Sequence, residues 1–163
     1  MVTTFSLDPR LAADALPVGR FALSRLLLMN DATYPWLILV PERPGVSELF
    51  DLGAADLAVL AAETSLTARM LKGLAGADKI NVAALGNVVA QLHVHVIARS
   101  VADPAWPGPV WGRAPAKPYA AGEAATVLDR LAAALDALAQ APAATPELSP
   151  EAGIAAKWRR LAP

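Results

Sequence analysis

The chain has 163 residues, enough for one compact domain with a buried core. Hydrophobic residues make up 55% of it and charged residues 18%, which excludes a largely disordered chain. Lys and Arg number 14 against 15 Asp and Glu, and this balance argues against a dedicated nucleic-acid binder but allows a pocket for one small anion. The absence of Cys excludes disulfides, thiolate nucleophiles and Cys-ligated zinc.

Neither a signal peptide nor a membrane span is expected. The N-terminal residues lack the basic start and apolar run of a signal peptide. The longest nearly uncharged stretch, residues 80–98, carries polar side chains that a spanning helix would not tolerate: Asn81, Asn87, Gln91, His93 and His95. We therefore expect a soluble, cytoplasmic protein that binds neither membranes nor nucleic acids.

The first quarter of the chain predicts a short helix followed by a hairpin. The helix is expected over residues 9–15, with Asp8 as its N-cap and Pro9 at its first position. Apolar patterns predict strands over residues 21–29 and 36–40. Turn-forming residues lie between them, so the two strands should pair antiparallel.

The middle of the chain predicts a long helix and a second pair of strands. Apolar residues at helical spacing indicate a helix over residues 54–74, with Asp51 as a candidate cap. Strands are expected over residues 79–85 and 91–99, joined by a turn at Gly86-Asn87. The order strand, strand, helix, strand, strand predicts an α+β fold with an antiparallel sheet.

The C-terminal part begins with a segment, residues 103–119, whose prolines predict an ordered loop or a lid. An amphipathic helix is expected over residues 122–140. The Pro/Ala-rich residues that follow predict a linker, and the weakly basic tail either docks or frays. We therefore expect a domain over residues 1–140, followed by a linker and a short tail over residues 141–163.

The two histidines of the chain, His93 and His95, stand two residues apart in a predicted strand. Because alternate residues of a strand point the same way, Gln91, His93 and His95 should share one face. Three interpretations remain open. The histidines are half-buried residues with local hydrogen bonds, or one neutral imidazole is the nucleophile of a phosphoryl or nucleotidyl transfer. The third is a metal site completed by a carboxylate such as Asp31, Asp103 or Glu42.

The segment around these residues resembles the signature of the histidine-triad (HIT) superfamily, in which His residues alternate with apolar ones. The matching run is Asn81-Val-Ala-Ala-Leu-Gly86-Asn87-Val-Val-Ala-Gln91-Leu-His93-Val-His95-Val-Ile97. Upstream, residues 26–30 (LLLMN) and 36–41 (WLILVP) are similar to the family's first hairpin. The resemblance implies an antiparallel sheet of about five strands with helices packed on it. The chain departs from the family at the first triad position, which is Gln91.

This resemblance implies a nucleotide hydrolase or nucleotidyl transferase that acts on the α-phosphate of a nucleoside phosphate ester, anhydride or phosphoramidate. His93 would be the nucleophile that forms a nucleotidyl-histidine intermediate. His95 would contact the phosphate or leaving-group oxygens. Gln91 would organise the nucleophile in place of the first His, since an amide offers one donor and one acceptor. No metal or other cofactor is implied.

The resemblance also suggests residues that bind the substrate and a quaternary state. Asn30 matches the position that binds the ribose hydroxyls, and Asn81 and Asn87 match positions near the phosphate and leaving group. A homodimer is implied. The substrate stays open between a diadenosine or other dinucleoside polyphosphate, a phosphoramidate and an aminoacyl adenylate. Two alternatives are a nucleotide-binding protein with little or no turnover and a metal-binding domain that uses His93 and His95.

Overall fold

The computed structural model describes residues 4–140 and 150–161. Within these ranges six strands form one antiparallel sheet in the order β4-β5-β3-β2-β1-β6. The strands are β1 (Ala15–Arg20), β2 (Ser24–Met29), β3 (Trp36–Pro41), β4 (Lys79–Ala83), β5 (Val94–Arg99) and β6 (Arg159–Arg160). The helices are α1 (Pro9–Asp14), the 3-10 turn η1 (Leu49–Asp51), α2 (Ala54–Ala75), α3 (Glu123–Gln140) and α4 (Pro150–Ala155). The predicted α+β class is confirmed.

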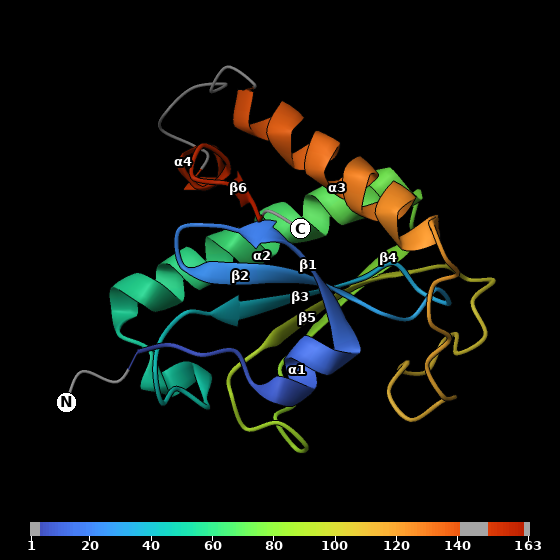
Figure 1. Ribbon diagram of the computed structural model, residues 1–163, viewed down its shortest axis with the longest axis horizontal. Helices are drawn as coiled ribbons and strands as arrows, with labels where there is room; N and C mark the ends of the chain where they lie inside the picture. The colour runs from blue at the N-terminus through green and yellow to red at the C-terminus, as the bar shows by residue number, and fades with distance from the viewer. Residues whose placement is uncertain (1–3, 141–149, 162–163) are drawn as a thin grey trace.

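Figure 1 shows the sheet between two layers, with α2 and α3 on one face and α1 on the other. Because successive residues of a strand point to opposite faces, the apolar strands β2 and β3 supply both layers. Leu26 and Leu39 pack under α2 and α3, whereas Leu27 and Ile38 pack toward α1. This double burial explains why both strands are continuous apolar runs.

The hairpin and the helices follow the local sequence signals. β2 and β3 pair antiparallel as predicted. The Asp8 carboxylate accepts a hydrogen bond of 2.8 Å from the Arg10 N–H and so caps α1. α2 ends at Gly76, whose φ of 60° is favourable for glycine. The candidate cap was wrong, because Gly53 precedes α2 and the Asp51 carboxylate instead accepts the N–H groups of Ser47 and Glu48, just before η1.

Two strand boundaries differ from the prediction. β1 was not expected, since Pro17 and Gly19 both disfavour a strand, and the pairing of β1 with β2 is irregular between these two residues. β2 begins at Ser24 rather than residue 21, because residues 21–23 form the turn that joins it to β1. The sheet therefore has six strands where about five were expected.

The C-terminal tail packs against the rest of the fold. Trp158 is only 3% exposed, and its ring lies 5.3 Å from that of Phe21. A Cβ atom at Gly19 would overlap the Trp158 ring, so this close approach requires glycine. Residues 141–149, most of the expected linker, lie outside the described residues. None of the described helices is long and apolar enough to cross a membrane.

The Pro-rich segment predicted over residues 103–119 contains turns and neither helix nor strand, as expected. A buried ion pair fixes its start: the Arg99 guanidinium donates to the Asp103 carboxylate at 2.7 and 2.9 Å, and Arg99 is 1% exposed. The Asp31 carboxylate fixes the far end by accepting the Lys117 N–H at 3.2 Å. This anchoring places Trp111 over the sheet face that faces α1.

Candidate active site

His93 immediately precedes β5 and His95 is its second residue, and each is 7% exposed. Their rings are 4.9 Å apart and nearly perpendicular, at 79°. In the sheet, His95 lies opposite Ile38 on β3 and Ala83 on β4, which makes the position rigid. The structure therefore brings the two imidazoles together, as their spacing predicted.

The main chain fixes which nitrogen of His93 carries the proton. Nδ1 of His93 lies 2.7 Å from the carbonyl oxygen of Gln91. A carbonyl oxygen can only accept a hydrogen bond, so Nδ1 is the protonated nitrogen. The neutral ring then carries its lone pair on Nε2, the form of imidazole that acts as a nucleophile.

His95 has the opposite arrangement. The indole N–H of Trp36 donates to Nδ1 of His95 at 2.9 Å, and both side chains are buried. Since an indole N–H is only a donor, Nδ1 carries a lone pair and the proton of the neutral ring lies on Nε2. Burial, together with the nearby His93, lowers the pKa of His95 to about 4. His95 is therefore a neutral hydrogen-bond donor at physiological pH.

Both imidazoles line a cavity of about 410 Å³ on the sheet face that faces α1. Its walls come from α1 and β1, from β2 and β3, from the loop after β4 and from the Pro-rich segment. The lining residues are Leu11, Asp14, Ala15, Met29, Trp36, Ile38, Leu85, Gly86, Asn87, Val88, Val89, His93, His95, Trp111 and Gly112. The predominantly apolar walls and few polar groups are typical of a small-molecule site.

The predicted strand over residues 91–99 begins only at Val94, so the strand alternation does not extend to Gln91. The Gln91 side chain points to the N-terminal segment instead: its Oε1 accepts the Asp8 N–H at 2.9 Å, and its Nε2 donates to the Ser6 carbonyl at 2.8 Å. The contact that Gln91 makes with the histidines is through its own carbonyl oxygen.

The three asparagines of the predicted site lie in different places. Asn87 lines the cavity. Asn30 does not, and its Oδ1 accepts the Tyr119 N–H at 3.1 Å. Asn81 holds the buried Arg99, whose Nη1 donates to its Oδ1 at 2.6 Å. Only Asn87 is thus brought together with the two imidazoles.

The carboxylates considered as a third metal ligand are engaged elsewhere. Asp103 pairs with Arg99, Glu42 pairs with Arg20 and Arg25, and Asp31 accepts main-chain N–H groups. In residues 4–140 and 150–161, no group of three or more His, Cys, Asp or Glu side chains could hold a metal ion. The two imidazoles therefore lack a third protein ligand in this part of the chain.

Trp36 and Trp111 are site residues that the sequence did not identify as partners of the histidines. The rings of both stand edge-on to His95, with ring centroids 5.4 Å away in each case. Trp36 lies opposite Ile97, because β3 pairs with β5, and its side chain reaches His95, two residues away along β5. The sequence predicts an antiparallel sheet, but its local patterns do not show that β3 pairs with β5.

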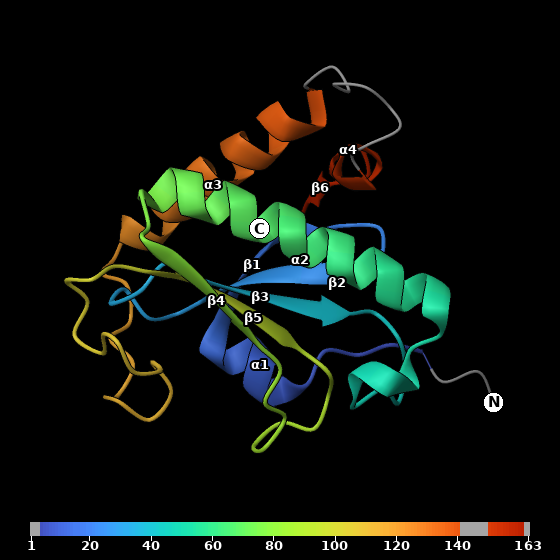
Figure 2. The same ribbon diagram turned by 180° about the vertical axis from the view of Figure 1, so that it is seen from behind.

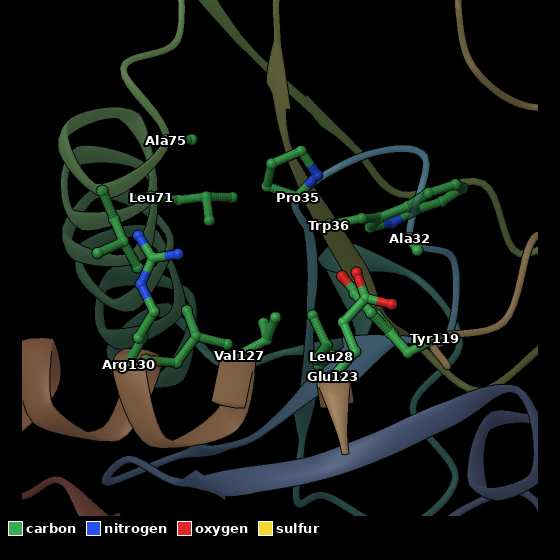
Figure 3. Close-up of a pocket in the computed structure, with 12 residues that line it drawn as sticks. Leu28, Ala32, Pro35, Trp36, Leu71, Ala75, Tyr119, Glu123, Val127 and Arg130 are labelled. Atoms are coloured by element: carbon green, nitrogen blue, oxygen red, sulfur yellow. The ribbon is translucent and has the colours of Figure 1, made fainter. Parts of the chain in front are cut away.

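A second cavity, of about 240 Å³, lies on the opposite face of the sheet. Figure 3 shows Leu71 of α2, Val127 and Arg130 of α3 and Leu28 of β2 around it. Trp36 lines both cavities and so separates them. The second cavity contains no histidine, and the chemistry of the paired imidazoles belongs to the first.

Comparison with known proteins agrees with this fold. The HIT domain model matches residues 10–101. The chain is 52% identical to a histidine triad protein from Sinorhizobium meliloti 1021, with a TM-score of 0.77 over 80% of this chain and 97% of that one. It is 46% identical to a histidine triad protein from Marinobacter aquaeolei VT8, with a TM-score of 0.79 over 81% and 96%.

A third solved structure, a histidine triad protein from Bradyrhizobium japonicum, is 45% identical, with a TM-score of 0.77 over 79% of this chain and 96% of that one. No protein with a curated description matches. The fold and the paired imidazoles define an α+β protein with an imidazole-lined ligand cavity. The chain belongs to the HIT family, and this membership supports a nucleotide-binding or hydrolase-type function.

Proposed function

We propose that the protein is a nucleotide hydrolase or nucleotidyl transferase that acts on the α-phosphate of a nucleoside phosphate through a nucleotidyl-histidine intermediate. The observation that carries this proposal is the 2.7 Å contact between Nδ1 of His93 and the Gln91 carbonyl. It leaves the lone pair of His93 on Nε2, in a ring that lines a cavity large enough for a small ligand.

The proposed reaction has two steps. In the first, Nε2 of His93 attacks the α-phosphorus, an N–P bond forms, and the bond from phosphorus to the leaving group breaks. In the second, water or another acceptor attacks the phosphorus, loses a proton to solvent and displaces His93. Hydrolysis then releases a nucleoside monophosphate, and both steps need positioning and charge stabilisation more than further covalent chemistry.

Neutral donors would stabilise the phosphate oxygens. Nε2–H of His95 is one such donor. The loop between β4 and β5 supplies others: none of the main-chain N–H groups of residues 86–90 donates to an acceptor in the described part of the chain. Gly86 has a φ of 70°, a conformation found in turns whose N–H groups bind anions. Asn87 lies in this loop and lines the cavity.

A nucleotide-binding protein with little turnover is the second candidate. It is favoured by the Gln91 side chain, whose amide donor and acceptor are both used by the N-terminal segment. The first triad position therefore gives His93 a carbonyl oxygen but no side-chain contact. Such a protein would bind nucleoside monophosphates without forming the covalent intermediate.

The first test uses purified protein with adenosine and guanosine polyphosphates and phosphoramidates, beside a His93→Asn variant. We expect nucleoside monophosphate to be released and the mass of early-quenched protein to rise by one nucleotidyl group, and both signals to be lost in the variant. Asn keeps a polar group at this position but lacks the nucleophilic nitrogen. If the protein binds monophosphate but releases none from these substrates, the result would instead support the binding protein. If it shows no binding and no release, both functions are contradicted.

We also propose that two copies associate through the edge of the sheet at β4. Figure 2 shows β4 at this edge, and it pairs only with β5 among the described strands. Val82 of β4 is 50% exposed, and the neighbouring Leu49 and Leu57 are 43% and 40% exposed. These residues line an apolar groove of about 500 Å³ between β4 and α2. A second β4, running antiparallel, would continue the sheet and cover the groove in a two-fold dimer.

Val82→Lys places a charge in the centre of the exposed surface at β4. We expect the wild-type protein to sediment as a dimer and Val82→Lys to dissociate at least tenfold more readily, because the charge would lose its hydration on association. Val101→Lys is the control, since Val101 is 62% exposed and does not line the groove. A wild-type monomer, or a dimer that Val82→Lys leaves intact, would refute the β4 interface.

A further inference from the structure

The hydrogen bond between Trp36 and His95 restricts the chemistry of His95. The indole N–H approaches Nδ1 at 2.9 Å, and the two side chains come from paired strands, β3 and β5. Trp36 is 6% exposed and His95 7%, so little solvent competes for this bond. Nδ1 is thereby kept as an acceptor, and the single proton of the ring stays on Nε2.

A second proton on His95 is disfavoured for a geometric reason. It would have to bind Nδ1, where it would face the N–H of Trp36, so two donors would meet without an acceptor. The titratable side chains that line the cavity are His93, His95 and Asp14. The neighbouring His93 and the burial of the ring also oppose a positive charge.

We propose that the substrates are anhydrides of the nucleoside phosphate and not phosphoramidates; this inference rests on the proposed function. The leaving group of an anhydride departs as an anion. When His93 forms its N–P bond, the P–O bond of an anhydride breaks and the electron pair leaves on the oxygen of a phosphate or carboxylate. This leaving group needs no proton at neutral pH. Nε2–H of His95 stabilises it by donating a hydrogen bond and keeps its proton.

A phosphoramidate makes a different demand. When its P–N bond breaks, the electron pair leaves on nitrogen, and the departing amine must take a proton. His95 has one proton, on Nε2, and giving it up would leave an imidazolate. Cationic His95 could supply the proton, but the Trp36 N–H opposes that form. Proton donation by a well-placed acid accelerates such steps by about 10² to 10⁴, and phosphoramidates would lose this advantage here.

The experiment compares kcat/KM for two substrates that share adenosine monophosphate, diadenosine tetraphosphate and adenosine 5′-phosphoramidate. We expect the wild-type enzyme to prefer the anhydride by about a hundredfold or more, the lower end of the range for general acid catalysis. Trp36→Phe keeps a ring but removes the N–H, which frees Nδ1 of His95 to take a proton. The preference should then narrow by about tenfold, the scale of one hydrogen bond to a charged or buried group.

Trp106→Phe is the matched control, because it makes the same substitution at a tryptophan of the Pro-rich segment that is 39% exposed and does not line the cavity. It should leave the preference unchanged. If the wild-type enzyme cleaves the phosphoramidate as fast as the anhydride, or Trp36→Phe leaves the ratio unaltered, the inference is wrong while the proposed function stands. If the wild type releases nucleoside monophosphate neither from these two substrates nor from their guanosine counterparts, both the inference and the proposed function are wrong.

A measurement without turnover tests the same point if Trp36→Phe folds poorly. Imidazole ¹⁵N chemical shifts of the wild-type protein should show His95 as a neutral ring with its proton on Nε2 between pH 6 and 8. The two histidines are assigned by means of His93→Asn, which removes one of the two sets of signals. A His95 ring protonated on Nδ1 in this range would overturn the inference.

Discussion

Glu63 is a buried acid of α2 that the proposed chemistry does not use. It is 0% exposed, and one carboxyl oxygen accepts the Leu23 N–H at 2.8 Å. The other oxygen lies buried without a partner, as do the hydroxyl oxygens of Ser24 and Thr67. Burial raises the pKa of Glu63, so the folded protein favours the protonated carboxyl.

This residue should make stability depend on pH. Because the folded pKa exceeds the unfolded one, the stabilisation that Glu63 contributes is fully present below the unfolded pKa and is lost as pH rises through the folded pKa. Glu63→Gln keeps the acceptor for Leu23 and supplies a neutral donor for Ser24 or Thr67. We expect it to raise the free energy of unfolding at pH 7 by about 1 kcal/mol, the scale of one net hydrogen bond, and by less at pH 4.

Urea unfolding at pH 4, 5.5 and 7 measures this difference. Glu48→Gln is the control, because it makes the same substitution at an exposed glutamate. A gap between Glu63→Gln and the wild type that stays constant across these three pH values would show that Glu63 does not titrate differently in the folded state.

The candidate site could be predicted from the sequence only as far as its residues are local. The spacing of His93 and His95 predicts that their side chains lie together, and the structure places their rings 4.9 Å apart. The partners of the Gln91 side chain are 83 and 85 residues away in sequence, and no local pattern points to them. Trp36, 59 residues from His95, contacts it only because β3 and β5 are neighbours.

Among the helices and strands, too, the predictions that hold are those that rest on local sequence patterns. α2 and β3 end within one residue of their predicted ends, because helical spacing, apolar runs and terminating Gly or Pro residues are local signals. β1 has no such signal: it is a strand because β2 on one side and β6 on the other offer hydrogen-bond partners. β5 begins late because the Leu92 N–H turns away to the Val46 carbonyl at 3.0 Å.

At the scale of the whole molecule, the C-terminal tail completes the sheet and the core. β6 extends the sheet beyond β1, with Gly19 opposite Arg160. Trp158 fills the space between the sheet and α3, and its indole N–H donates to the Asp136 carboxylate at 3.0 Å. Ile154 and Ala155 of α4 belong to the same core as α2 and α3. The tail therefore acts as a structural part of the domain.

Removing the Trp158 ring tests this role. Trp158→Ala should lower the free energy of unfolding by about 3 kcal/mol or more, as large-to-small substitutions of buried aromatic residues do. Gly19→Ala should cost about 1–3 kcal/mol, because its Cβ would overlap the Trp158 ring and the Arg159 carbonyl oxygen. Combining the two should cost less than their sum, since the overlap with the ring is then absent and only the overlap with the Arg159 carbonyl remains. Urea unfolding of both single variants and the double variant measures this coupling, and strictly additive costs would show that the tail does not pack on β1.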